Sequence, residues 1–188
     1  MMPCMDAALH NATGTPDERS ALAPRNHAYY MDQALRQAHR AAEAGEVPAG
    51  CVIAGPPGPD GARAIVGRAH NQVELLKDPT AHAEMIAITQ AAAALGDWRL
   101  ENTILYVTKE PCSMCAGAII LARVPLVVYG CADPKRGGHT VFGILNHAGL
   151  NHRCEVVTGV REDECRALLQ AFFAAKRRGQ TGGTTDAT

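Results

Sequence analysis

Segments with the apolar spacing of a helix alternate along this chain with short apolar runs that favour strands. Over residues 27–44, apolar side chains recur at steps of three and four, which predicts a helix closed by Gly45. The runs 49–54 and 62–69 flank a turn rich in proline and glycine at 55–61, a pattern typical of a β-hairpin. This part of the chain is therefore expected to place a helix beside paired strands.

The same alternation continues toward the C-terminus. A helix is predicted over 81–95, capped by Thr80 and closed by Gly96. The Gly- and His-rich residues 131–152 follow neither pattern and are expected to form a loop. The remaining predicted elements are strands over 103–108, 125–130 and 154–160, a helix over 112–122 with Pro111 in its first turn, and a helix over 162–178. Helices interleaved with short strands predict an α/β sandwich in which helices cover both faces of one sheet.

The length of 188 residues fits one domain. We expect this domain to span residues 26–178, with residues 1–25 as a flexible N-terminal extension and residues 179–188 as a flexible tail. Apolar residues make up 47% of the chain and charged residues 20%, a mixture that supports a packed core rather than general disorder. The formal net charge of −1 excludes a basic field over the whole molecule, so nucleic-acid binding would have to use local patches.

Cysteine usage and hydropathy indicate where the chain resides. The seven cysteines form an odd set with one close pair, which differs from the disulfide framework of a small secreted domain. No run of about 18 apolar residues occurs, and residues 1–25 lack the basic start and apolar stretch of a secretory signal. These features predict reduced thiols in a cytoplasmic protein that does not span a membrane.

Two short motifs carry the chemistry of the chain. His82 and Glu84 stand at the start of one predicted helix, and Cys112 and Cys115 at the start of another. Cysteines three apart on a helix share a face, and the positive end of the helix favours their thiolates. One imidazole and two thiolates suit Zn²⁺, and three protein ligands leave a fourth tetrahedral position for water. The motifs therefore predict a catalytic zinc site with His82, Cys112 and Cys115 as ligands.

Glu84 is predicted to move protons rather than to bind the metal. It lies two residues from His82, and helix neighbours at that spacing point to different sides. Zinc makes its water acidic near neutral pH, so a nearby carboxylate can accept that proton and deliver it to a ring nitrogen and a leaving amine. This arrangement indicates metal-assisted hydrolysis with Glu84 as the catalytic residue.

Other interpretations of the cysteine pair stay open at this point. A lone CxxC also occurs in redox pairs, and a closed structural zinc site would form if Cys131 or His139 supplied a fourth ligand. In the second case, the chain would be a zinc-stabilised binding module without catalysis. Neither interpretation explains why His82 and Glu84 occupy the start of a separate helix.

The combination of HxE with PCxxC is the known signature of zinc deaminases. The chain resembles the bacterial tRNA adenosine deaminase family over residues 27–178, well beyond that signature. The resemblance is carried by GEVPAG (45–50), HNQVE (70–74), DPTAHAEM (78–85), LYVTKEPCSMCAGAI (105–119) and DPKRGG (133–138). The chain departs from the family at GGHTVFG (137–143), where members usually carry a Gly-Ala-x-Gly-Ser stretch.

The resemblance implies a fold, an assembly and a reaction. The fold would be the cytidine-deaminase-like three-layer α/β/α sandwich around a five-stranded mixed sheet, assembled as a homodimer with tRNA crossing both subunits. The reaction would convert the wobble adenosine of an anticodon to inosine. A deaminase of a free base or nucleotide, of the guanine or cytosine type, is the main alternative because the same zinc chemistry serves small substrates.

The resemblance also implies substrate contacts. Asn71 would bind the flipped base, and the backbone amide of Ala83 would meet the edge of that base. Val47 and Pro48 would form a wall of the pocket. The expected RNA contacts are Asp133, Lys135 and the pair Phe172 and Phe173.

Overall fold

The computed structural model describes residues 27–181, and its centre is a five-stranded sheet. The expected extension 1–25 and residues 182–188 of the expected tail lie outside the described residues. The strands are β1 (Gly50–Pro57), β2 (Arg63–His70), β3 (Ile104–Lys109), β4 (Leu126–Cys131) and β5 (Glu155–Thr158). Their order is β2-β1-β3-β4-β5, with β1 antiparallel to both of its neighbours and β3, β4 and β5 parallel. The prediction of a five-stranded mixed sheet is confirmed.

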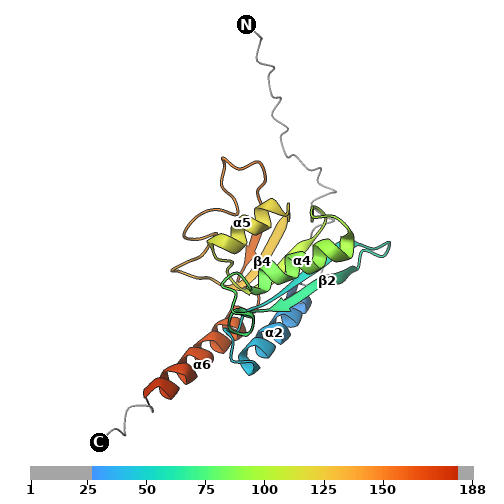
Figure 1. The fold of residues 1–188 in the computed structure, drawn as a ribbon. Helices are drawn as coiled ribbons and strands as arrows, with labels where there is room; N and C mark the ends of the chain where they lie inside the picture. The colour runs from blue at the N-terminus through green and yellow to red at the C-terminus, as the bar shows by residue number, and fades with distance from the viewer. Residues whose placement is uncertain (1–26, 182–188) are drawn as a thin grey trace, which may run out of the picture.

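Helices cover both faces of this sheet (Figure 1). The helices α2 (His27–Glu43) and α6 (Glu162–Thr181) pack on one face, and α4 (Ala83–Leu95) and α5 (Ser113–Leu121) pack on the other. The one-turn helix α3 (Val73–Leu76) follows β2 and is not predicted by the sequence pattern. This arrangement confirms the three-layer α/β/α sandwich. None of the helices within residues 27–181 is long and apolar enough to cross a membrane.

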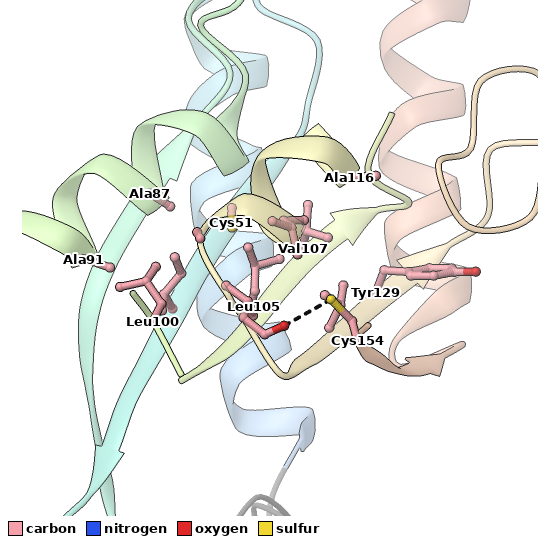
Figure 2. Packing of buried hydrophobic residues seen from close by; sticks show 14 of the residues in the cluster. Cys51, Ala87, Ala91, Leu100, Leu105, Val107, Ala116, Tyr129 and Cys154 are labelled. Carbon is pink, nitrogen blue, oxygen red and sulfur yellow. Dashed lines mark hydrogen bonds between the residues drawn. The ribbon is translucent and has the colours of Figure 1, made fainter. Parts of the chain in front are cut away.

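Strand residues alternate between two apolar layers of the core. Cys51, Leu105 and Val107 lie in the layer between the sheet and the helices α4 and α5, together with Ala87 and Ala116 (Figure 2). Intervening residues of the same strands pack toward α2 and α6, among them Val52, Ile104 and Tyr106. The central strands are apolar on both sides because helices cover both faces of the sheet. Their sequences therefore appear as continuous apolar runs.

The start of α4 differs from the prediction. His82 is the N-cap and Ala83 the first helical residue, so Thr80 does not cap the helix. The Thr80 hydroxyl instead donates to the Asp78 carboxylate at 2.7 Å, and the amide of His82 donates to the Thr80 carbonyl at 2.7 Å. The residues before α4 thus form a turn of their own, and the helix begins after it.

The other element boundaries show smaller differences. The helix α5 begins at Ser113 with Cys112 as its N-cap, so Pro111 precedes the helix rather than lying in its first turn. The backbone of Cys112 is held outside the helix by an antiparallel bridge to Gly137. The helix α6 continues to Thr181, three residues into the expected tail. Terminal residues of helices and strands depend on tertiary contacts as well as on local pattern, which explains these shifts.

Gly67 in β2 lets α4 approach the sheet closely. A Cβ atom at this position would overlap the carbonyl oxygen of Ala87 in α4. We expect Gly67→Ala to lower the free energy of unfolding by about 1–3 kcal/mol, because a rigid helix backbone has to move. Urea unfolding followed by circular dichroism measures this change.

Gly117→Ala is the matched control for this substitution. Nothing lies within 4 Å of a methyl group added at Gly117 in α5. The control should raise the free energy of unfolding by about 0.5–1 kcal/mol, because glycine is unfavourable inside a helix. Equal losses of stability in both variants would contradict the close approach of α4.

Candidate active site

His82 is positioned by the turn that precedes α4. Its backbone is extended, with φ −72° and ψ 154°, and its side chain makes no capping hydrogen bond to the helix. The amide of Gln72 donates to the carbonyl of Ala81 at 3.0 Å, which ties this turn to the segment after β2. The imidazole is directed instead toward the start of α5.

Cys112 and Cys115 lie at that start, a few residues after the end of β3. Cys112 is the N-cap with an extended backbone, and Cys115 is the third residue of the helix. The amide of Ala116 donates to the Cys112 carbonyl at 2.8 Å, which closes the first turn. One helical turn therefore brings both sulfur atoms to the same end of α5.

The three predicted ligands form one group, which we call the metal cluster. Nδ1 of His82 lies 3.6 Å from Sγ of Cys112 and 3.4 Å from Sγ of Cys115. All three donor atoms lie within 4.8 Å of one another. A tetrahedral Zn²⁺ with Zn–S and Zn–N distances of about 2.3 Å and 2.1 Å would separate sulfur from nitrogen by about 3.6 Å. The cluster could hold a metal ion, and its donor types and spacing fit zinc.

Neither of the residues considered as a fourth ligand joins the metal cluster. Sγ of Cys131 donates to the carbonyl of Thr108, and the ring of His139 lies with Nδ1 at 3.0 Å from the hydroxyl of Tyr129. Among residues 27–181, the metal cluster is the one group of three or more potential ligands so close together. The structure therefore offers no support for a closed site completed by Cys131 or His139.

Hydrogen bonds among the cluster side chains polarise the thiols. The hydrogen bond with Cys115 lowers the pKa of Cys112 well below its usual range, and the imidazole of His82 acts in the same direction. The same hydrogen bond, together with burial, raises the pKa of Cys115. The hydrogen bond with Cys112 raises the pKa of His82. The direction of these shifts favours the thiolate form of Cys112, and the thiolate is the form of cysteine that binds metals.

Glu84 lies beside the metal cluster but outside it. It is the second residue of α4, and its side chain is only 5% exposed. Burial raises the pKa of its carboxyl, and the carboxyl interacts with the thiol of Cys115 through a hydrogen bond. His82 has the extended backbone of an N-cap, whereas Glu84 lies inside the helix. A buried carboxyl with a raised pKa is suited to accept and return a proton near neutral pH.

The sequence and the fold both match known deaminases. A family model of MafB19-like deaminases matches residues 25–177. The chain is 48% identical over 150 residues to the tRNA-specific adenosine deaminase of Bacillus subtilis (strain 168), an alignment that covers 79% of this chain and 89% of that protein. The chain belongs to the tRNA-specific adenosine deaminase family. The protein of that name from Aquifex aeolicus (strain VF5) is 46% identical over 150 residues, which cover 79% of this chain and 95% of that protein.

A solved structure agrees with this family assignment. It comes from a study of A-to-I editing by tRNA:A34 deaminases at the wobble position of transfer RNA. It matches this chain with a TM-score of 0.69 at 39% sequence identity, and the match covers 75% of this chain and 99% of that chain. The expected cytidine-deaminase-like fold is confirmed, and the chain is a hydrolytic deaminase.

A buried glutamate that the sequence analysis missed holds a loop of this deaminase beside the metal cluster. Glu110 precedes the cysteine motif and is 2% exposed. Its Oε1 accepts hydrogen bonds from the amides of His139 and Thr140 at 3.1 Å and 2.7 Å, and its Oε2 accepts one from the amide of Asp133 at 2.8 Å. An acidic residue between an apolar strand and an apolar helix is the one hint of this role in the sequence.

The same loop carries two of the expected RNA contacts. Asp133 is buried and forms an ion pair with Lys109, and its Oδ1 accepts hydrogen bonds from the amides of Lys135 and Arg136 at 3.0 Å and 3.2 Å. The side chain of Lys135 is exposed. Asp133 thus shapes the loop that presents Lys135 to solvent.

The ion pair makes stability depend on pH. Burial opposes ionisation of Asp133, but the hydrogen bond and charge of Lys109, together with the hydrogen bonds from the amides of Lys135 and Arg136, outweigh burial and lower the pKa of this carboxyl in the folded protein. A lowered pKa stabilises the fold above the unfolded-state pKa, and the stabilisation is lost as the pH falls through the folded-state value. Asp133→Asn places an amide against the Lys109 ammonium, so we expect a loss of about 1.5–3 kcal/mol at neutral pH.

Urea unfolding of the wild type and this variant, from about pH 7 to about pH 3, measures the loss. The difference between the two proteins should shrink toward the acid end of the range. Asp60→Asn is the matched control, because Asp60 is exposed and accepts one backbone hydrogen bond, from Ala62 at 3.0 Å. A difference that does not change with pH would show that the ion pair is not its source.

Backbone hydrogen bonds connect the residues expected to line the base pocket with the turn before His82. Asn71 is buried just after β2, and its amide donates to the Ala49 carbonyl at 3.0 Å. This hydrogen bond places Asn71 beside the segment that contains Val47 and Pro48. Ala83 is buried at the first position of α4, directly after the histidine of the metal cluster.

The aromatic pair of α6 lies apart from these residues. The rings of Phe172 and Phe173 pack edge to face with centroids 5.4 Å apart. Phe173, Arg166 and Arg177 contribute to a pocket of about 300 Å³ between α6 and the end of β4. Because α6 covers the opposite face of the sheet from α4 and α5, the structure does not bring this pair together with the metal cluster.

Proposed function

We propose that this deaminase binds one zinc ion in the metal cluster and converts the wobble adenosine of a tRNA anticodon to inosine. The observation that carries the proposal is a cluster of one imidazole and two thiols, with a buried carboxylate beside it. Relatives named tRNA-specific adenosine deaminase at 44–48% identity over most of the chain support the substrate.

The side chains of the site divide the chemistry between them. His82, Cys112 and Cys115 would hold zinc, which when bound makes a water molecule acidic near neutral pH. Glu84 accepts one proton from the attacking water and delivers it to the ring nitrogen next to the reacting carbon. It then takes the second proton from the same oxygen and delivers it to the amino group, which leaves as ammonia. Because this carboxyl is buried, bulk water does not reach it, and the proton passes between the carboxyl and the substrate without exchange with solvent.

The pocket residues orient the base. Asn71 hydrogen-bonds the flipped base, and the backbone amide of Ala83 donates to its edge. Val47 and Pro48 form an apolar wall, and Pro48 is buried while Val47 is half-buried. These assignments are supported by the proximity of Asn71 to the 47–49 segment and to the turn before α4.

The RNA outside the flipped base would contact a few separate surface sites, because the protein as a whole carries no net positive charge. The loop shaped by Asp133 presents Lys135, and α6 presents Phe173 with nearby arginines. Local contacts of this kind suit a folded stem-loop, because the net charge of −1 does not attract long nucleic acid nonspecifically.

The decisive assay supplies purified, zinc-loaded protein with an anticodon stem-loop that contains adenosine at the wobble position, with guanine and with cytidine. Inosine should form from the stem-loop, and xanthine and uridine should not form from the other two substrates. A stem-loop with guanosine at the wobble position is the control for RNA binding without reaction. Xanthine in the absence of inosine would replace the proposed substrate with a free base.

We also propose a cytoplasmic homodimer. Six cysteines within residues 27–181 are free, and five of them are buried, which suits a reducing compartment. Leu121 at the end of α5 and Val141 and Phe142 in the loop after β4 are 73%, 45% and 52% exposed, which supports protein contacts for these apolar side chains. Sedimentation equilibrium at several concentrations tests the assembly, and a monomer at micromolar concentration would contradict it.

A further inference from the structure

Glu46 is a buried carboxylate outside the metal cluster. It lies between α2 and β1, is 2% exposed, and belongs to none of the ion pairs described within residues 27–181. Its Oε2 accepts a hydrogen bond from Nδ2 of Asn71 at 3.0 Å, and its Oε1 accepts one from the amide of Leu75 at 2.7 Å. Burying a carboxylate costs free energy unless hydrogen bonds replace those it made to water. The groups that donate these hydrogen bonds to Glu46 therefore indicate its role.

The bond to Asn71 decides which way the amide of that residue faces. An ionised carboxylate only accepts hydrogen bonds, whereas an asparagine side chain carries a donor end and an acceptor end. Glu46 therefore requires Nδ2 of Asn71 to face it. One Nδ2 hydrogen is used in this way, and within residues 27–181 no other side-chain hydrogen bond of Asn71 is described, which leaves the second Nδ2 hydrogen and Oδ1 for a ligand.

Backbone hydrogen bonds place this pair at the expected pocket. The amide of Asn71 donates to Ala49, and the amide of the next residue, Gln72, donates to Ala81, the residue before His82. Glu46 itself precedes the wall residue Val47 in the chain. The carboxylate thus connects the wall segment, Asn71 and the first turn of α3.

We propose that Glu46 is a positioning residue that sets the orientation of the Asn71 amide and thereby the donor and acceptor pattern offered to the base. This inference rests on the proposed role of Asn71 in binding the base. Glu46 does not touch the substrate and acts through Asn71 alone.

Glu46→Gln tests the proposal because it changes one acceptor into a donor without changing the shape of the side chain. If the glutamine oxygen keeps the hydrogen bond from Leu75, its NH₂ group faces Asn71, and two donors meet. The Asn71 amide relieves this conflict by turning over, which presents the wrong groups to the base. We expect kcat/KM to fall about 10- to 100-fold, with the zinc content and the melting temperature unchanged.

A double-mutant cycle with Asn71→Ala separates positioning from general structural support. Once the Asn71 amide is gone, Glu46→Gln should change kcat/KM by less than about twofold. Glu43→Gln is the matched control, since Glu43 is an exposed residue at the end of α2, and it should behave as wild type. If Glu46→Gln costs as much in the Asn71→Ala background as in the wild type, the proposal is wrong.

A spectroscopic measurement keeps this test independent of the substrate. The side-chain amide signals of Asn71, assigned by their loss in Asn71→Ala, should shift in Glu46→Gln and in Glu46→Asp, which shortens the reach to Asn71. Unchanged signals overturn the positioning role even if the enzyme edits tRNA. If the wild type deaminates guanine rather than the stem-loop, the proposed substrate fails, and the cycle is measured with guanine.

Discussion

Replacing Glu84 with glutamine should leave one zinc ion per chain and reduce turnover by about 10²- to 10⁴-fold. Zinc binding persists because the carboxylate lies outside the metal cluster. Turnover falls because an amide of the same shape cannot accept a proton from water or deliver one to the base. Metal analysis of the purified variant and single-turnover assays on the anticodon stem-loop measure the two quantities separately.

Stability and a surface control complete this experiment. The melting temperature of Glu84→Gln should not fall, because burial already disfavours the ionised carboxyl, as its raised pKa indicates. Glu101→Gln alters an exposed glutamate in the same way and should retain full turnover. Loss of zinc from Glu84→Gln would show that the carboxylate of Glu84 is a metal ligand rather than a group that transfers protons.

Replacing Cys115 with serine should remove both zinc and activity. A hydroxyl is a poor ligand for zinc compared with a thiolate, and two remaining ligands cannot hold the ion in a defined position. We expect zinc affinity to fall by more than about 100-fold, which exceeds the usual effect of losing a residue that only supports a ligand. Competition with a chromogenic chelator measures the affinity.

The effect of a chelator on stability gives a second measurement of the same loss. Removal of zinc should lower the melting temperature of the wild type, because a ligand that binds only the folded state stabilises it by mass action. The melting temperature of Cys115→Ser should not respond to the chelator. The control is Cys154→Ser, because Cys154 is also buried and its thiol donates to the Val124 carbonyl at 3.0 Å (Figure 2), a bond that a serine hydroxyl can also make. If Cys154→Ser lost as much zinc as Cys115→Ser, general damage to the core would explain both results.

Local sequence was sufficient for the elements and for the central chemistry of the site. Within residues 27–181, apolar spacing predicted the four long helices and the five strands to within a few residues, because these patterns follow directly from which side of an element is buried. The spacing of Cys112 and Cys115 predicted a shared metal, since residues three apart in a helical turn meet at the same end. The prediction that His82 joins these two cysteines as the third ligand rested on the HxE and PCxxC motifs and not on local geometry.

Long-range contacts decided what surrounds that chemistry. The pattern placed His82 inside a helix capped by Thr80, whereas the turn from Asp78 to Thr80 makes His82 the N-cap. Glu46 and Glu110 were missed because their partners are distant in sequence and lie on other elements. A glutamate in a polar stretch looks like a solvated surface residue until the fold covers it.

The sequence alone determined which residues can bind a metal and move a proton, because the spacing of the two cysteines is a local property and His82 and Glu84 belong to a recognised motif. Only the tertiary structure decided which imidazole nitrogen faces the thiols, that Cys131 and His139 stay out of the metal cluster, and which way the Asn71 amide points. Those outcomes depend on the strand order, on the helix starts and on buried hydrogen bonds between distant segments. Such contacts form only when the whole sandwich is assembled, so no short stretch of sequence encodes them.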